Sequence, residues 1–291
     1  MIRLFLFFFL ISLSQPLLAQ DDYTYVGVLK LSDSTFISYK LDFVEKDGLV
    51  TGYSTTDMGG PHETKSYISG YFDDAANTLN FFESGILYTK SEITQNDFCF
   101  VHFDGRLKKM NETQKIQGLF KGLFSDGQEC ISGELVLSNF KKILKRTKKM
   151  DKKIDRSIFV SKEKKEKINL VKMMDSLSLN IIKKDEVLSV FTSSDKVNLT
   201  LFDAGQEDGD IITVLVNGRI ILKDYQVTTQ KETLTVTLDS PKTELKVIAV
   251  NNGSMGGNTV KIDISDDLNT IETLTNLHAK ETASFNILKK E

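Results

Sequence analysis

Residue types that carry common catalytic chemistry are scarce in this chain of 291 residues. Its three histidines, His62, His102 and His278, lie far apart and lack an obvious partner motif. The sequence has no G-x-S-x-G elbow, no H-E-x-x-H pair and no glycine-rich phosphate loop. These absences remove the commonest signatures of serine hydrolases, zinc peptidases and nucleotide-binding enzymes, so we predict no catalytic residue.

Proline and cysteine are also rare. The chain has only three prolines, and this small number suits long unbroken strands, because proline cannot donate a hydrogen bond to a sheet. The two cysteines, Cys99 and Cys130, do not have zinc-ligand spacing. An even cysteine count in an exported chain favours a disulfide, and closing this loop would contribute roughly 3–4 kcal/mol. We therefore predict a Cys99–Cys130 bridge, with two buried free thiols as the alternative.

Long apolar runs are absent except at the start of the chain. Residues 1–3 include one positive charge, and residues 4–13 are almost entirely apolar. This run is shorter than the roughly 20 residues of a membrane span. It predicts a secretory signal peptide, residues 1–19, with the mature chain starting at Gln20. We expect a secreted or periplasmic, cell-envelope protein without a transmembrane segment after cleavage; an uncleaved anchor is the alternative.

Charge is distributed unevenly along the chain. Residues 21–140 hold 18 acidic and 10 basic side chains, a net charge of -8. Residues 141–167 hold 13 basic and 4 acidic side chains, a net charge of +9. Residues 168–291 hold 18 acidic and 13 basic side chains, a net charge of -5. Two acidic blocks flanking a basic segment predict two domains and a connector.

The first block, residues 20–138, reads as strands throughout. Stretches such as "FISYKLDFV" and "KIQGLFKGLF" alternate apolar and polar residues, which is typical of half-buried antiparallel strands. "EKDGLV" is a typical hairpin turn, because Asp-Gly tolerates positive φ. About eight strands in hairpin order predict either an up-and-down antiparallel β-barrel or a β-sandwich.

The basic connector, residues 139–167, differs in kind. Ile143, Met150, Ile154 and Ile158 recur at near-helical spacing, so both a short helix and an extended linker fit. Its charge favours anionic surfaces, although a solvated connector is the simpler interpretation. It has no interleaved aromatic residues that could stack bases, and export removes most nucleic-acid partners, so we expect no nucleic-acid binding. The two domains should fold independently around this flexible joint.

The last block, residues 168–291, returns to period-two alternation. Strands rich in Val, Ile, Leu and Thr, separated by regular turns, predict an antiparallel β-sandwich. The stretch "VNLTLFDAGQEDGDIITVLVNGRIIL", with the later "ELKVIAVNNGSMGGNT", resembles a recurring C-terminal β-sandwich module of exported Bacteroidetes proteins. The resemblance covers residues 185–288, although Gly256-Gly257 stands where a Pro-Pro pair is usual. It implies the architecture and carries no assigned activity.

The acidic loop "DAGQEDGD", residues 203–210, is the strongest candidate site. Calcium takes six to eight oxygen ligands, so carboxylates clustered on a turn could hold it. The spacing is not that of an EF-hand, so a second loop would have to contribute. The candidate metal ligands are Asp203, Glu207, Asp208, Asp210, Asn252 and Asn258. The alternative is structural: a solvated turn in which glycines supply the geometry. Calcium is the single candidate cofactor.

These observations favour an exported, non-enzymatic binding or accessory protein. Its ligand could be a glycan, a small molecule in the barrel or an envelope protein. An envelope-associated hydrolase and a purely structural envelope component are the alternatives. The loop of residues 55–64, "TTDMGGPHET", could gate a ligand at a barrel mouth, or be an ordinary turn.

Overall fold

The computed structural model describes residues 22–92, 97–107, 115–156, 180–205, 207–254 and 257–290. These residues form eighteen strands and one helix, so the all-β prediction is confirmed. The predicted signal peptide, residues 1–19, lies outside the described residues. No helix among the described residues is long and apolar enough to cross a membrane.

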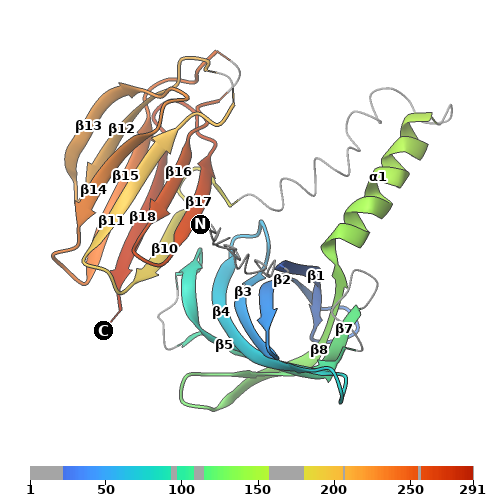
Figure 1. The fold of residues 1–291 in the computed structure, drawn as a ribbon. Helices are drawn as coiled ribbons and strands as arrows, with labels where there is room; N and C mark the ends of the chain where they lie inside the picture. The colour runs from blue at the N-terminus through green and yellow to red at the C-terminus, as the bar shows by residue number, and fades with distance from the viewer. Residues whose placement is uncertain are drawn as a thin grey trace, which may run out of the picture.

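The first eight strands close into an antiparallel barrel (Figure 1). Each pairs with the next along the chain, and β1 pairs with β8 to complete the ring. The strands are β1 (Asp22–Lys30), β2 (Phe36–Lys46), β3 (Leu49–Thr56), β4 (Thr64–Asp73), β5 (Thr78–Thr89), β6 (Phe100–Arg106), β7 (Lys115–Leu123) and β8 (Glu129–Asn139). The structure thus decides for the barrel over the sandwich, and closure leaves few open edges.

The sequence pattern explains both the turns and the core of the barrel. Asp47 and Gly48 have φ of 53° and 84°, as the predicted β2–β3 hairpin turn requires. Alternate residues of each strand point inward, and Tyr25, Tyr39 and Leu41 are among those fully buried there. Burying a side chain of this size stabilises the fold by about 1.5–3 kcal/mol. Apolar and aromatic side chains pack against one another inside the barrel.

The other ten strands form a β-sandwich around its own core. One sheet has the order β13-β12-β15-β18-β10, and the other has the order β14-β11-β16-β17-β9. The strands are β9 (Ile181–Ile182), β10 (Val187–Thr192), β11 (Lys196–Phe202), β12 (Ile211–Val216), β13 (Arg219–Gln226), β14 (Glu232–Thr237), β15 (Lys242–Ala249), β16 (Lys261–Ser265), β17 (Thr270–Thr275) and β18 (Thr282–Lys289).

The sandwich departs from the purely antiparallel expectation in two places. β10 pairs in parallel with β18, and β9 pairs in parallel with β17. Both pairs join strands from opposite ends of the domain sequence, so no hairpin sets their direction. Asn217 and Gly218 form the hairpin turn between β12 and β13, with φ of 50° and 79°.

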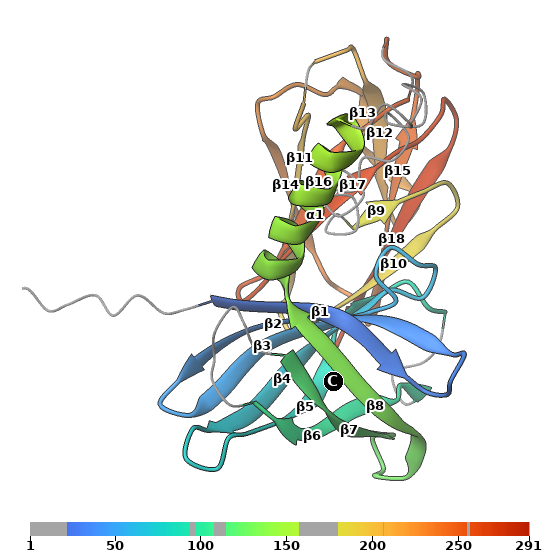
Figure 2. The same cartoon turned by 90° about the vertical axis from the view of Figure 1, so that its right-hand side faces the viewer.

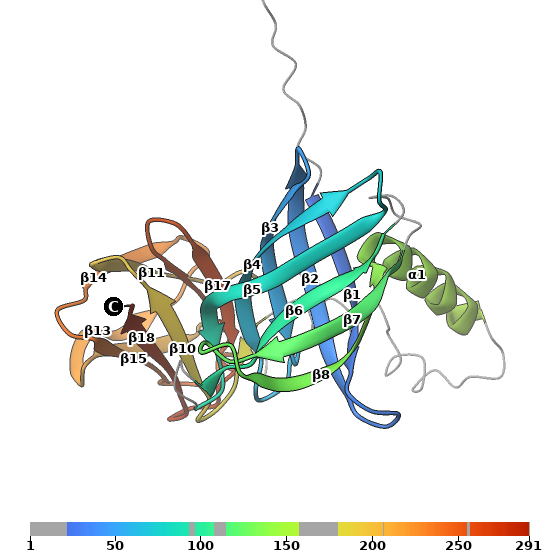
Figure 3. The same cartoon turned by 90° about the horizontal axis from the view of Figure 1, so that it is seen from below.

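The two domains share a continuous sheet, which corrects the expectation of a joint made only by the connector. β10 of the sandwich pairs with the end of β5 of the barrel, at Ser189↔Thr89 and Val190↔Tyr88. Figure 3 shows the sandwich lying against the β5 side of the barrel. Sequence reasoning missed this contact because period-two alternation does not reveal which strand edges meet.

The connector begins with a helix. α1 (Phe140–Arg156) continues directly from β8, and Figure 2 shows it rising from the end of that strand. Asn139, at the end of β8, accepts a hydrogen bond from the N–H of Lys142 through its Oδ1, as helix-capping residues do. The helical alternative is therefore correct for this part of residues 139–167. Residues 157–179 lie outside the described residues.

Candidate functional site

A small polar cleft lies where the barrel meets the sandwich. Its volume is about 230 Å³. The barrel side comes from β2, β3, β4, β5 and the loop between β3 and β4, and the sandwich side comes from residue 180 and from β17. The lining residues are Lys40, Thr55, Met58, Glu63, Lys65, Tyr88, Asn180, Thr270, Ile271 and Glu272. The loop that the sequence suggested as a gate, residues 55–64, thus borders this cleft.

Asn180 is the unusual residue in the wall of the cleft. Its side chain is 8% exposed, and neither its Nδ2 nor its Oδ1 has a hydrogen-bond partner within the described chain. The backbone is held in place, because its carbonyl accepts from the N–H of Leu274 at 3.0 Å. A buried polar group left unsatisfied costs about 1–3 kcal/mol. The amide therefore has two N–H donors on Nδ2 and an acceptor on Oδ1 that no described residue uses.

The barrel wall of the cleft is rigid. The Glu63 carboxylate accepts from the Tyr88 hydroxyl at 2.9 Å and from the N–H of Gly59 at 2.6 Å. Asp57 accepts from the N–H groups of Gly60 and His62 across the same loop. Burial, with the nearby Glu63 charge, raises the pKa of Tyr88 above its usual range, so the hydroxyl stays a donor. These bonds hold the loop in one conformation beside the cleft.

Two lysines and two glutamates balance the charge of the cleft. Lys40 pairs with Asp42 at 2.9 Å, and the Lys65 ammonium lies 4.7 Å from the centroid of the Tyr53 ring. Burial lowers the pKa of Lys65, and the charges of Asp42 and the two cleft glutamates oppose that effect. With Lys40 and Lys65 matched by Glu63 and Glu272, the cleft carries no formal excess charge.

A larger depression of about 730 Å³ lies on the outer face of β1–β5. Several of its polar side chains already bond to one another or to the sandwich: Thr24 donates to Asp42 at 2.8 Å, and the Tyr53 hydroxyl donates to Asn269 at 3.1 Å. A polar ligand there would have to compete with these bonds. The smaller cleft at the domain junction, with its unsatisfied amide, is the better candidate site.

Glu83, on β5, is an acid buried inside the barrel. Its carboxylate accepts from the hydroxyls of Tyr39 and Ser54 at 3.1 and 2.5 Å and from the N–H of Val101 at 2.8 Å. Burial raises the pKa of Glu83, and the three hydrogen bonds oppose that rise. With every bond directed within the barrel, Glu83 ties β2, β3 and β6 together and faces no substrate space.

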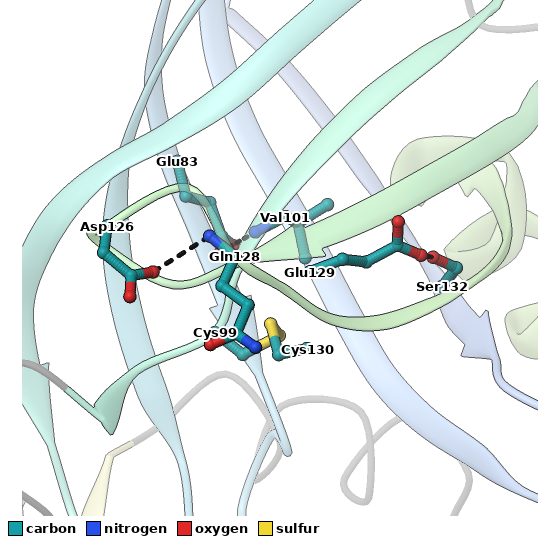
Figure 4. Close-up of a disulfide and its surroundings, with 8 residues drawn as sticks. All are labelled: Glu83, Cys99, Val101, Asp126, Gln128, Glu129, Cys130 and Ser132. Atoms are coloured by element: carbon teal, nitrogen blue, oxygen red, sulfur yellow. Dashed lines mark hydrogen bonds between the residues drawn. A yellow bond between two sulfur atoms is a disulfide. The ribbon is translucent and has the colours of Figure 1, made fainter.

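The predicted Cys99–Cys130 disulfide is confirmed, with Cα atoms 6.1 Å apart. It links the start of β6 to β8 across β7 (Figure 4). Gly122 of β7 lies beneath the bridge, where a Cβ atom would collide with the Cys99 sulfur. The close-up also shows Glu83 bonded to Val101 beside the bridge, so two ties meet at this end of the barrel.

Only some of the predicted metal ligands of the acidic loop lie close together. Asp210, 1% exposed, accepts from the N–H of Thr259 at 2.7 Å through Oδ2, and its Oδ1 faces the Asp208 carboxylate without a donor. Burial raises the pKa of Asp210 to about 6, and the charges of Asp208 and Asp203 add to that rise. Gly253 approaches both carboxylates so closely that a Cβ atom there would collide with them.

The other predicted metal ligands have different roles. Glu207 accepts from the backbone and hydroxyl of Thr229 at 2.7 and 2.8 Å, and Asn252 accepts from the N–H of Ala279 at 2.6 Å. Asn258 is fully buried and donates to the Ile211 carbonyl at 3.0 Å, while its Oδ1 makes no hydrogen bond. Among the described residues, no group of three or more acidic, histidine or cysteine side chains is placed to hold a metal ion.

The three histidines lie in separate environments. His62 Nδ1 lies 3.3 Å from the Ser91 hydroxyl, and His102 stacks on Phe82 on the outside of the barrel. Burial lowers the pKa of His102. His278 uses its backbone N–H to donate to Glu281. None of these contacts joins a histidine to a buried carboxylate.

Comparison with known proteins gives no further identification: no family model, curated protein or solved structure matches the chain. The resemblance of residues 185–288 to a β-sandwich module of exported Bacteroidetes proteins therefore stays a prediction. What the fold and the cleft define is a two-domain, all-β protein with a polar site at its domain junction.

Proposed function

We propose that this protein is an exported, non-enzymatic binding protein that holds a small, neutral, polar ligand in the cleft between barrel and sandwich. A single sugar unit or a polyol of that size is the ligand class we favour. The observation that carries the proposal is Asn180, whose amide is buried in the cleft wall with both polar atoms unsatisfied. Sites of this kind, with a few placed polar groups, commonly lie at domain interfaces.

Size and charge set the ligand class. A volume of about 230 Å³ corresponds to roughly seven or eight water molecules at about 30 Å³ each. The balance of two lysines against two glutamates favours a ligand without net charge. Sugar hydroxyls both donate and accept hydrogen bonds, which matches the amide of Asn180 and the hydroxyls of Thr55 and Thr270.

The alternatives receive less support from the same residues. A hydrolase would need a carboxylate facing its substrate, but both oxygens of Glu63 are engaged by Tyr88 and Gly59, and Glu272 is paired with Lys261 at 2.7 Å. A purely structural component agrees with the filled barrel. It leaves the unsatisfied amide of Asn180 unexplained.

Asn180→Leu tests the proposal on the mature chain. With no bond to lose, Leu should leave the ligand-free protein as stable or raise its melting temperature by a few degrees, at about 2–4 °C per kcal/mol. The wild type should gain about 3–6 °C from a bound neutral monosaccharide or polyol at tenfold excess over its Kd. The variant should lose this gain.

The control for this test is Asn198→Leu, because Asn198 is an exposed residue of β11 that does not line the cleft. It should keep the ligand-induced shift. A panel of neutral sugars and polyols that shifts neither wild type nor control would refute the sugar-binding proposal. Loss of folding in Asn180→Leu would show that the amide has a structural partner.

A calcium site in the acidic loop is the second candidate function. It is favoured by the Asp208–Asp210 carboxylates, which face each other with a donor-free oxygen on Asp210. A cation would relieve the repulsion between these carboxylates. The candidate ligands are now Asp203, Asp208, Asp210 and the side-chain oxygen Oδ1 of Asn258. Within the described part of the chain, Asp203 and Asp210 each accept a hydrogen bond through one oxygen only. Glu207 and Asn252 leave the set because Glu207 directs its carboxylate to Thr229 and the single side-chain oxygen of Asn252 accepts from Ala279.

Thermal melting tests the calcium proposal. Binding at a hundredfold excess over Kd stabilises the native state by about 2.7 kcal/mol, so millimolar calcium should raise the melting temperature by several degrees over chelator. Asp208→Asn and Asp210→Asn should keep the fold and lose the gain. Equal curves in calcium and chelator, or an equal effect of magnesium at the same ionic strength, would leave the loop as a solvated turn.

A further inference from the structure

Helix α1 carries its basic residues and its apolar residues on different sides of the helix. At 3.6 residues per turn, its basic residues fall within an arc of about 160° and its apolar residues within a separate arc of about 120°. The basic residues are Lys141, Lys142, Lys145, Arg146, Lys148, Lys149, Lys152, Lys153 and Arg156. The apolar arc holds Phe140, Ile143, Leu144, Met150 and Ile154, together with Thr147 and Asp151.

The apolar arc is not buried in the fold. Met150 is 54% exposed, and Ile143, Leu144 and Ile154 are partly exposed. The main contacts of α1 with described elements are to β1 and β8, from which it emerges. Figures 1 and 3 show it projecting from the barrel on the side away from the sandwich. A helix with this pattern, away from both cores, presents an apolar stripe and a basic face together.

We propose that α1 is a docking helix for an anionic lipid surface, with its apolar arc in the interface and its basic residues at the headgroups. Helices with this division of charge and apolar side chains bind membranes by lying in the interfacial plane. The rest of the protein fits this orientation. Residues 21–140 and 168–291 carry net charges of -8 and -5, so an anionic surface repels both domains and attracts only the helix.

Other binding partners would contact only one of the two faces of α1. Nucleic acid or an acidic polymer would engage the basic face and leave the apolar arc in water. A second copy of α1 could cover the apolar arc, but nine basic residues on each helix would then repel one another. An anionic bilayer satisfies both faces at once.

Vesicle flotation of the mature chain tests the proposal. The protein should float with vesicles that contain phosphatidylglycerol, stay behind with pure phosphatidylcholine, and dissociate as salt is raised. Replacing Lys148, Lys149, Lys152 and Lys153 by Gln should weaken binding by about a hundredfold or more, because each basic residue near an anionic surface contributes roughly fivefold. The matched Lys→Arg quadruple variant should bind like the wild type.

The apolar arc has its own test. Met150→Ser with Ile154→Ser should weaken vesicle binding by about tenfold or more, since their burial in the interface is lost. Met150→Leu with Ile154→Leu should retain it, and unchanged circular dichroism should show that both variants fold. Absence of binding to anionic vesicles at low salt would overturn the proposal. So would full binding by the serine variant, because simple attraction to any polyanion would then suffice.

Discussion

At the scale of single residues, two buried acids, Glu83 and Asp210, differ in how many hydrogen-bond donors surround them. Glu83 is buried with three donors, which bind strands of the barrel together. Asp210 is equally buried but has one donor on Oδ2 and faces Asp208 with the other oxygen. Hydrogen-bond donors stabilise a buried carboxylate and let it link strands. A buried carboxylate that faces another carboxylate is stabilised instead by binding a proton or a cation.

The raised pKa of Asp210 predicts how stability depends on pH. The folded protein holds this proton more tightly than the unfolded chain, so the stabilising contribution of Asp210 is complete below about pH 3.8 and is lost as pH rises through about 6. Since each tenfold change in proton affinity is worth about 1.4 kcal/mol, the loss is up to about 3 kcal/mol. Asp210→Asn should remove this loss.

Urea denaturation of wild type and Asp210→Asn at pH 4.5 and pH 7.5, without calcium, measures the effect. The variant should gain stability over the wild type at the higher pH, while the two proteins should be closer at the lower pH. Other acids titrate in both proteins and cancel in the comparison. An identical pH dependence of both proteins would mean that the pKa of Asp210 is not raised in the folded protein.

At the scale of elements, the barrel strands could be predicted from the local alternation of apolar and polar residues. Apolar and polar residues alternate over much of their length, and the Asp47-Gly48 turn marks the β2–β3 hairpin correctly. The shortest strand, β9, and the strand β17 escaped prediction. β9 is two residues long and pairs in parallel with β17, so it produces no hairpin signal. Asn180 stands immediately before β9, which is why no motif drew attention to it.

At the scale of the whole molecule, the junction makes the two domains a mechanical unit. Phe191 of β10 is 4% exposed and packs with Ile86 and Phe98 of the barrel. Lys90, at the end of β5, donates from Nζ to the Ile181 carbonyl at 2.9 Å. These contacts place the candidate cleft between surfaces that do not depend on the connector for their alignment.

Limited trypsin digestion tests this unit. Trypsin should cut among the lysines of α1, yet the two fragments should stay associated on size exclusion because the junction holds them. Phe191→Ala, expected to cost about 3–5 kcal/mol as a large buried truncation, should let the nicked fragments separate. Phe36→Ala, at a residue 53% exposed on the barrel, is the matched control. Separation of nicked wild-type fragments would restore the picture of independent domains.

The sequence by itself determined the all-β class, the two strand-rich blocks, the basic connector and the Cys99–Cys130 bridge. These features follow from local alternation, turn residues and composition, which act over a few neighbouring positions. The acidic loop was visible for the same reason, since its residues are consecutive. Local signals also explain why Glu207 was grouped with Asp208, although the structure directs it to Thr229.

Only the tertiary structure decided the features on which the proposed function rests. Asn180 and Glu63 are 117 positions apart in the numbering and meet only because β5 pairs with β10. Closure of the barrel, the filling of its lumen and the exposure of α1 depend likewise on which faces and edges meet. Such pairings arise from burial summed over whole surfaces, and no short stretch of sequence carries that information.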